Sequence, residues 1–363
     1  MGFLANIVAT TSVLLLISSY SRAVTADSCT ITSFDEISSV VASCSNVVFG
    51  SFTIPSGNKL AIKFLDGASV TFSGEVLFEH FNGDGPLLRL TINNGVVTGD
   101  DNHLFNGQGE SYWGLNGTKP LLMRLVAQNT NFQGFKIKNC PQRCISINGS
   151  NNTVISNFTI DNQDGVGKAK NTDGFDVSSS SGITIKDTIV TNQDDCVAIN
   201  SGSDILVDNL HCIGSHGFDI SVGQGSGNTN FVTNVTFQNS ILTGGLVGLS
   251  MLSHIEGGTG EVNSINYTNI HIEGSTDYAV FFHQDFSSAI QGNTGVPVGT
   301  VVFSDITFNN VTGFVDDTTD AAAVCLRCAS GFCKNFNFNG LQISGATKKD
   351  ECSIEPIGYK CNT

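Results

Sequence analysis

The segment Ile183-Thr184-Ile185-Lys186-Asp187 is the most informative about the architecture, because its pattern returns along most of the chain. The pattern is an apolar residue, any residue, an apolar residue, any residue, and then Asn or Asp. It recurs in the segments 205–209, 235–239, 265–269 and 301–305. Looser copies lie at 153–157 and, with Gly in the final position, at 336–340. The final positions of successive copies are separated by 30, 22, 30, 30, 36 and 35 residues.

This repeat predicts an all-β, single-domain parallel β-helix. Alternation with period two is typical of strands, and strands of a sandwich recur every ~8–12 residues, which is far too often for this spacing. A strand that recurs at longer, regular intervals is typical of a solenoid, whose strands stack in parallel about 4.8 Å apart. We therefore expect Ile183, Ile205, Val235, Ile265 and Val301 to form one inward ladder. The Asn or Asp that follows each strand is expected to cap a turn.

Both ends of the solenoid need a cover, because the first and last coils expose unpaired strand edges. Ser33 and Glu36 have the spacing of a capping box, and they open a short amphipathic helix through Val40 and Val41. This helix is expected to cover the first coil. The cysteine-rich tail from Cys325 is expected to close the other end.

Residues 1–26 have the features of a secretory signal peptide. The segment 7–17 is largely apolar, and Val24-Thr25-Ala26 offers a small-residue cleavage site. The apolar run is shorter than the roughly 20 residues that a membrane span requires, which argues against an anchor. We therefore expect a secreted, extracellular protein whose residues 27–363 form one β-helix domain.

The composition agrees with secretion. The chain has eleven cysteines, which a secreted protein would largely oxidise, and it carries seven Asn-x-Ser/Thr sequons. Zinc binding by Cys325, Cys328 and Cys333 is the weaker alternative, because no His lies nearby. The formal charge of −15 argues against nucleic acid as a partner. No segment predicts a membrane partner, a metal or a cofactor, and we expect a monomer.

Three short segments carry candidate chemistry: 171–176 (NTDGFD), 192–196 (NQDDC) and 214–217 (GSHG). Asp173 and Asp195 are 22 residues apart, and Asp195 and His216 are 21 apart, so that one winding of the chain would stack them. Hydrolysis of a glycosidic bond takes one carboxylic acid and one carboxylate, and adjacent carboxylates raise one pKa. Asp194 and Asp195 can face one cleft only if the chain bends there, because neighbours in a strand point to opposite faces.

On these motifs, and more loosely on Tyr278-Ala-Val-Phe-Phe with Gln284-Asp285-Phe286, the chain resembles the polygalacturonases of glycoside hydrolase family 28. The resemblance implies a right-handed parallel β-helix and an inverting hydrolase of the α-1,4-galacturonosyl linkages of pectin. It implies Asp194 as general acid, Asp173 and Asp195 as the pair that activates water, and His216 as a supporting residue near the scissile bond. It also implies that Tyr278 lines a sugar subsite, and that polygalacturonase-inhibiting proteins are candidate partners.

The resemblance further implies four disulfides: Cys29–Cys44, Cys196–Cys212, Cys328–Cys333 and Cys352–Cys361. The pairing of Cys140, Cys144 and Cys325 stays open. A bridge between Cys140 and Cys144 would leave Cys325 as the odd thiol.

The chain departs from the family where cations are expected. The family's Arg-Ile-Lys motif aligns with Met251-Leu252-Ser253, and no Lys or Arg occurs between Asp187 and Leu326. Three interpretations follow. The enzyme binds polygalacturonate in another way, with Lys168, Lys170 and Asn171 on the substrate side; or it hydrolyses a less charged pectic polymer; or it is a catalytically silent relative that binds wall polysaccharide or a polygalacturonase-inhibiting protein. A calcium-assisted pectate lyase is disfavoured by the missing cations.

Overall fold

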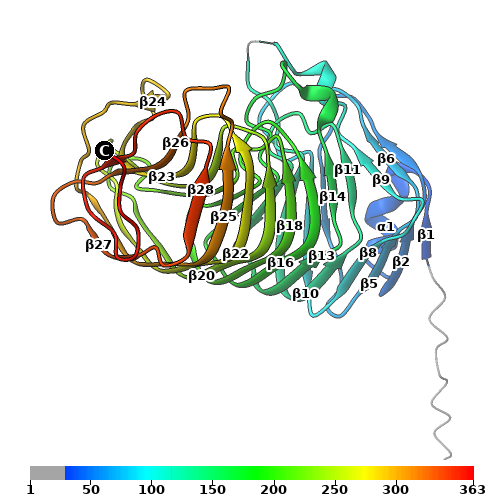
Figure 1. Cartoon of the computed structure of the whole chain (residues 1–363). Coiled ribbons are helices and arrows are strands. Elements are labelled where there is room, and N and C mark those ends of the chain that lie inside the picture. The colour runs from blue at the N-terminus through cyan, green and yellow to red at the C-terminus, as the bar shows by residue number, and fades with distance from the viewer. Residues whose placement is uncertain (1–28, 116) are drawn as a thin grey trace, which may run out of the picture.

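The computed structural model describes residues 29–115 and 117–363, which form one parallel β-helix. The strands lie side by side in coils from the end that carries α1 to the end that carries the C-terminus (Figure 1). The predicted all-β, single-domain solenoid with a small helix is therefore confirmed. The predicted signal peptide, residues 1–26, lies outside the described residues.

The strands form three sheets that run the length of the coil. The first sheet stacks β4 (Leu60–Lys63), β7 (Leu88–Asn93), β10 (Met123–Gln133), β12 (Ile145–Asn148), β15 (Phe175–Ser178), β17 (Val197–Ile199), β19 (Phe218–Val222), β21 (Val247–His254), β23 (Tyr278–Ser287), β26 (Ala322–Arg327) and β29 (Glu351–Cys352).

The second sheet stacks β1 (Cys29–Ile31), β2 (Asn46–Phe49), β5 (Ser69–Phe72), β8 (Val96–Gly99), the end of β10, β13 (Asn151–Ser156), β16 (Ser180–Thr191), β18 (Gly202–Ile213), β20 (Thr229–Thr243), β22 (Thr259–Ser275), β25 (Val301–Val315) and β27 (Cys333–Asn337).

The third sheet stacks β3 (Phe52–Ile54), β6 (Glu75–Phe78), β9 (Leu104–Asn106), β11 (Lys136–Lys138), β14 (Thr159–Asp161), the second halves of β16 to β25, and β28 (Leu341–Ser344). The short β24 (Gly292–Asn293) pairs antiparallel with β23. The helices are η1 (Phe34–Glu36), α1 (Ile37–Val41), η2 (Gly109–Ser111) and η3 (Gln163–Gly165). In the described part of the chain, no helix has the length and apolar character needed to cross a bilayer.

The predicted inward ladder is confirmed for four positions and wrong for the fifth. Ile183, Ile205, Val235 and Ile265 are buried and pair in register from coil to coil. The next partner of Ile265 is Ile306, whereas Val301 pairs with Gly260 at the start of β25. Both candidate segments alternate with period two and end in Asn or Asp, so the sequence pattern alone could not choose between them.

The residue that ends each repeat bends the strand from the second sheet into the third. Asp187, Asn209, Asn239 and Asn269 all have φ between +52° and +57°, a left-handed conformation that Asn and Asp adopt more readily than most residues. Their side chains also bond from coil to coil: Asn269 Nδ2 donates to Asn239 Oδ1 at 3.1 Å, and Asn310 Nδ2 donates to Asn269 Oδ1 at 3.0 Å. The residues predicted to cap the turns therefore also form a ladder of side-chain hydrogen bonds between successive coils.

The core inside the coil is filled by stacked aromatic rings. Phe49 stacks on its register partner Phe72 with ring centroids 4.6 Å apart, and Phe237 stacks on its register partner Tyr267 at 5.1 Å. An aromatic pair contributes about 0.5–1.5 kcal/mol beyond the burial of its area. Because identical strand positions stack directly, one aromatic residue per coil is enough to build such a ladder.

Both predicted end caps are present. At the N-terminal end, Glu36 Oε2 accepts the backbone N–H of Ser33 at 3.1 Å, and Ile37 and Val41 of α1 are buried. At the other end, Phe338 stacks on Phe308 with centroids 4.1 Å apart.

The four predicted disulfides are present, and a fifth joins Cys140 to Cys144. Cys325 is a free, buried thiol in β26, so the zinc alternative for Cys325, Cys328 and Cys333 is wrong. Figure 1 places α1 and the C-terminus at opposite ends of the coil.

Candidate active site

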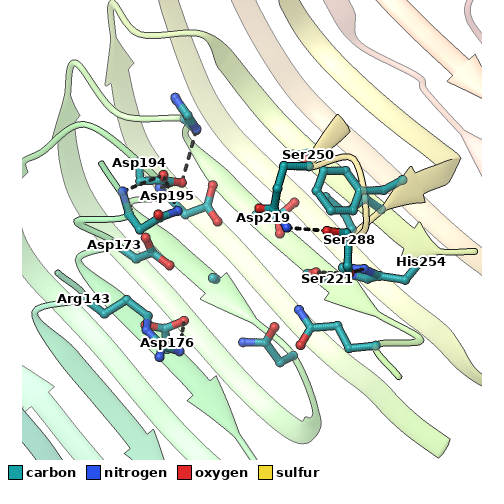
Figure 2. A pocket seen from close by; sticks show the side chains of 18 of the residues that line it. Arg143, Asp173, Asp176, Asp194, Asp195, Asp219, Ser221, Ser250, His254 and Ser288 are labelled. Carbon is teal, nitrogen blue, oxygen red and sulfur yellow. Dashed lines mark hydrogen bonds and ion pairs between the residues drawn. The ribbon is translucent and has the colours of Figure 1, made fainter. Parts of the chain in front are cut away.

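A cleft of about 960 Å³ lies over the first sheet, between β15 and β23. It is lined by the four predicted catalytic residues Asp173, Asp194, Asp195 and His216, together with Asp176, Asp219 and side chains of β21 and β23. Figure 2 shows Asp173, Asp194 and Asp195 gathered on one side of the cleft, and Ser221, Ser250 and His254 on the other. The winding therefore brings the predicted four groups to one surface.

The floor of the cleft is a row of residues at one register position in successive strands. Asp176 pairs with Ala198, Ala198 with Asp219, Asp219 with Ser250, and Ser250 with Phe281. Residues on either side of this row in the sequence point into the core, because side chains alternate along a strand. The cleft thus receives every second residue of β15 to β23.

Asp194 and Asp195 reach the cleft because the chain bends between β16 and β17, as the sequence requires. The bend is held by Asn192, whose buried amide Nδ2 donates to the carbonyl oxygens of Thr172 at 2.9 Å, Asp194 at 3.0 Å and Asp195 at 2.8 Å. One side chain therefore fixes the backbone of both aspartates to the preceding coil.

The Asp194 carboxylate accepts four donors. Its Oδ2 accepts the backbone N–H of Asn171 at 3.1 Å and the Asn171 amide at 3.3 Å. Its Oδ1 accepts the backbone N–H of Asp195 at 3.1 Å and lies 3.3 Å from His216 Nδ1. Asn171, predicted to face the substrate, lines the cleft and also orients Asp194.

His216 is placed by a tight turn. Its backbone N–H donates to the Asp194 carbonyl at 2.8 Å. Gly217 follows with φ +74°, and a Cβ there would come within 1.8 Å of the Gly248 carbonyl oxygen, so only glycine fits. Burial lowers the pKa of His216, but the hydrogen bond and charge of Asp194 and the charge of Asp219 outweigh burial and leave it raised.

The cluster of carboxylates strongly perturbs its own ionisation. Burial, followed by the charges of neighbouring aspartates, raises the pKa values of Asp173 and Asp195 well above their usual range. Burial also raises the pKa of Asp176 to about 7, against the opposing effect of Arg143, and that of Asp219 to about 6. Such coupled carboxylates share protons at mildly acidic pH, which is the condition for general acid catalysis.

Several carboxylate oxygens in this cluster lack a protein partner. Asp173 Oδ1, Asp176 Oδ2 and Asp219 Oδ1 are buried and accept no hydrogen bond within the described structure. A buried oxygen without a partner costs roughly 1–3 kcal/mol. Such atoms on a cleft floor are suited to a bound water or a sugar hydroxyl.

Among the described residues that line the cleft, Arg143 is the one permanent cation, against five aspartates. Its Nη1 lies 4.0 Å from Asp176 Oδ1. The side of the cleft formed by β19, β21 and β23 therefore offers a bound sugar no permanent positive charge.

Three of the predicted substrate-binding residues do not line the cleft. Tyr278 is buried next to the cleft-lining Phe281, on which its ring stacks with centroids 4.5 Å apart, and its hydroxyl lies 3.5 Å from Lys348 Nζ. Lys168 and Lys170 are exposed and lie outside the set of lining residues. A role of these two lysines toward the substrate stays a prediction.

The predicted alignment of Met251-Leu252-Ser253 with the missing cations is wrong by one residue. Met251 and Ser253 are fully buried, whereas Ser250 and Leu252 line the cleft. Because a strand alternates its faces, a shift by one residue exchanges the whole set of cleft-facing side chains. The positions where cations would reach the substrate are therefore Ser250 and Leu252, and both are still uncharged.

Asp176 and Asp219 lie in strands β15 and β19 and face the cleft. His254 and His283 were missed altogether, although both line the cleft from β21 and β23. Their position in the strand could have identified them, because residues an even number apart share one face of a strand. His254 is related in this way to Ser250, and His283 to Phe281.

Asp194, Asp195 and His216 have potential ligand atoms that all lie within 4.8 Å of one another. Three ligands are few for a hard cation that prefers six or more oxygen atoms, and Asp194 already accepts four donors. The arrangement is better suited to proton transfer than to metal binding.

Comparison with known proteins gives one consistent result. Residues 44–361 match the family model of glycosyl hydrolases family 28. The chain is 38% identical to endopolygalacturonase I of Aspergillus niger over 345 residues, which are 93% of this chain and 92% of that protein. It is 36% identical to a polygalacturonase of Phaedon cochleariae, over 92% of this chain and 93% of that one.

A solved structure of endopolygalacturonase I from Stereum purpureum, complexed with two galacturonates, superposes on this chain with a TM-score of 0.78. The two are 30% identical, and the superposition covers 90% of this chain and 97% of that one.

Proposed function

Because this chain belongs to glycosyl hydrolases family 28, we propose that its cleft hydrolyses the α-1,4-galacturonosyl linkages of pectin with inversion. The sequence match over most of the chain makes it a polygalacturonase-like glycosidase, as the sequence predicted. The observation that carries the proposal for this cleft is the convergence of Asp173, Asp194, Asp195 and His216 on one surface.

Asp194 is the proposed general acid. It stands at the edge of the carboxylate cluster with 19% of its side chain exposed, where it can reach a glycosidic oxygen. His216, whose pKa is raised, donates to Asp194 and compensates the negative charge that Asp194 gains when it gives up its proton. At mildly acidic pH the protons shared within the carboxylate cluster can reprotonate Asp194 after each catalytic cycle.

Asp173 and Asp195 are the proposed pair that holds the attacking water. The unpartnered Asp173 Oδ1 on the cleft floor supports this role. Inverting enzymes usually separate their carboxyl groups by roughly 6.5–9.5 Å, whereas Asp194 and Asp195 approach within 4.8 Å. Inversion is therefore assigned from the family, not from this spacing.

The test is to incubate the purified protein with polygalacturonic acid, pectin and neutral wall polymers, and to assay reducing ends. The Asp194→Asn variant should lose about 10²–10⁴-fold in rate, the usual contribution of a positioned acid. Asp317→Asn, an exposed residue of the loop after β25, is the matched control and should keep full activity. Release of reducing ends from no polymer would favour the silent relative, and release from neutral polymers alone would favour a shifted substrate.

Secretion and the partners belong to the same proposal. Five disulfides support an oxidising compartment. A polysaccharide that enters an open cleft needs no second subunit, so we propose a monomer, which size-exclusion chromatography with light scattering would test. A polygalacturonase-inhibiting protein is the proposed protein partner, to be tested by inhibition of reducing-end release.

A further inference from the structure

One half of the cleft differs in chemistry from the carboxylate cluster beside it. Its described lining residues from β19, β21 and β23 include Ser221, Ser250, Leu252, His254, Phe281 and His283, which we call the neutral subsite. Asp219 borders it, and Figure 2 shows Ser221, Ser250, His254 and Ser288 grouped together beyond Asp219. Both halves belong to one cleft, so a polysaccharide that extends past the carboxylate cluster on this side would enter this half.

The buried Asp285 determines which ring nitrogen of His283 can accept a hydrogen bond. Its Nδ1 lies 2.7 Å from Oδ1 of the fully buried Asp285, whose Oδ2 accepts Arg327 Nη1 at 2.9 Å. Arg327 is held in turn by Glu351, through Nε and Nη2 at 2.7 Å each. Because the ionised Asp285 must accept from Nδ1–H, the Nε2 of a neutral His283 is left as an acceptor for the cleft.

His254 lies within hydrogen-bond distance of two serine hydroxyls, and a carboxylate oxygen, Glu256 Oε2, lies 3.8 Å from its Nδ1. Its Nε2 lies 3.1 Å from Ser221 Oγ and its Nδ1 lies 2.8 Å from Ser288 Oγ. Burial lowers the pKa values of both His254 and His283, although Glu256 and Asp285 act in the opposite direction. The neutral forms of both rings are therefore favoured, and the acceptor Nε2 of His283 suits a hydroxyl donor, whereas it can bond neither a carboxylate nor a carbonyl oxygen.

The neutral subsite would bind a free uronate carboxylate weakly. Such a carboxylate would face the acceptor nitrogen of His283 and the carboxylate of Asp219, while Arg143, the lining cation, lies on the far side beside Asp176. Like charges brought together in a confined site are strongly unfavourable. Leu252 is partly exposed and pairs with His283, whose ring stacks on Phe281 with centroids 4.0 Å apart, so the same place offers an apolar contact.

We propose that the neutral subsite binds a galacturonate unit whose carboxyl group is methyl-esterified, with the ester methyl against Leu252 and Phe281. A sugar hydroxyl then donates to His283 Nε2, and the uncharged ester avoids Asp219. This inference rests on the proposed function and specifies its substrate as esterified pectin. Ser250 and Leu252 are the specificity-determining residues, since they occupy the two positions from which cations would reach a free carboxylate.

The test compares one polymer in two forms, polygalacturonic acid and the same material after chemical methyl-esterification, at about pH 6.5. Initial rates of reducing-end release should favour the esterified form at least tenfold. Leu252→Lys, alone or with Ser250→Arg, should reduce this preference at least tenfold. Ile241→Lys, which adds the same charge on an exposed outer position of β20, should leave the preference unchanged.

Faster release from polygalacturonic acid by the parent protein would overturn the inference while leaving the proposed function intact. An unchanged preference in Leu252→Lys would overturn it too. If no polymer is cleaved, the proposed function fails, and calorimetric binding of free and methyl-esterified trigalacturonide still decides the inference. Tighter binding of the esterified trisaccharide supports it, and tighter binding of the free acid refutes it.

Discussion

Replacement of Asp219 by Asn should stabilise the protein at neutral and alkaline pH and leave it unchanged in acid. Asp219 is 3% exposed, and burial raises its pKa from 3.8 to about 6. Asn has the shape of the protonated carboxyl group, and it can keep a hydrogen bond with Ser250. The substitution therefore removes the ionisation of this residue and little else.

The sign follows from the direction of the shift. Between pH 3.8 and about 6 the unfolded chain loses the Asp219 proton while the folded protein keeps it. The stability that this group contributes is therefore fully present in acid and is lost as the pH rises through 6. A shift of about two pKa units corresponds to about 3 kcal/mol in the free energy of unfolding, which the parent protein lacks above pH 6 and the variant regains.

The assay is thermal unfolding followed by circular dichroism at pH 4 and pH 8. Unfolding entropy of about 2.1 cal/mol/K per residue gives about 0.8 kcal/mol/K for 363 residues, so 3 kcal/mol is a rise of about 4 °C in Tm. We expect this rise at pH 8 and a change below about 1 °C at pH 4. Asp317→Asn is the control and should change Tm by less than about 1 °C at both values.

An equal rise in Tm at both pH values would refute the reasoning, because it would show a packing effect that does not depend on ionisation. No rise at pH 8 would show that the Asp219 carboxylate is solvated in the cleft, and that burial does not raise its pKa.

Three further predictions concern the geometry of the site. Asn192→Ala removes the buried amide that holds the bend at residues 192–196, and should lower both kcat and the free energy of unfolding, the latter by about 2–4 kcal/mol, measured by denaturant titration. Loss of the Cys196–Cys212 disulfide in Cys196→Ser with Cys212→Ser should cost about 3 kcal/mol for its loop of 16 residues, and an unchanged unfolding midpoint would contradict this. Proton NMR of the first product should show the inverted anomer, and a retained anomer would refute the assignment of Asp173 and Asp195 to water activation.

Much of the fold followed from local pattern. Period-two alternation ending in Asn or Asp predicted the coil, because a residue that tolerates positive φ is needed wherever a strand bends into the next sheet. The pattern failed at 301–310, where two adjacent segments satisfy it equally well and only pairing with β22 selects Ile306.

Some residues of the candidate active site could likewise be predicted from the sequence, and others could not. The spacing of the motifs was enough to single out the carboxylates 173, 194 and 195 together with His216, because it equals one turn of the coil, and the composition showed that cations are missing between 187 and 326. The folded chain was needed to learn which residues of β21 and β23 face the cleft, that Tyr278 is buried against Phe281, and that Asp285 and Arg327 hold His283. The reason is that a one-residue change of register inverts every side chain of a strand, and register is set by contacts with neighbouring coils that are distant in sequence.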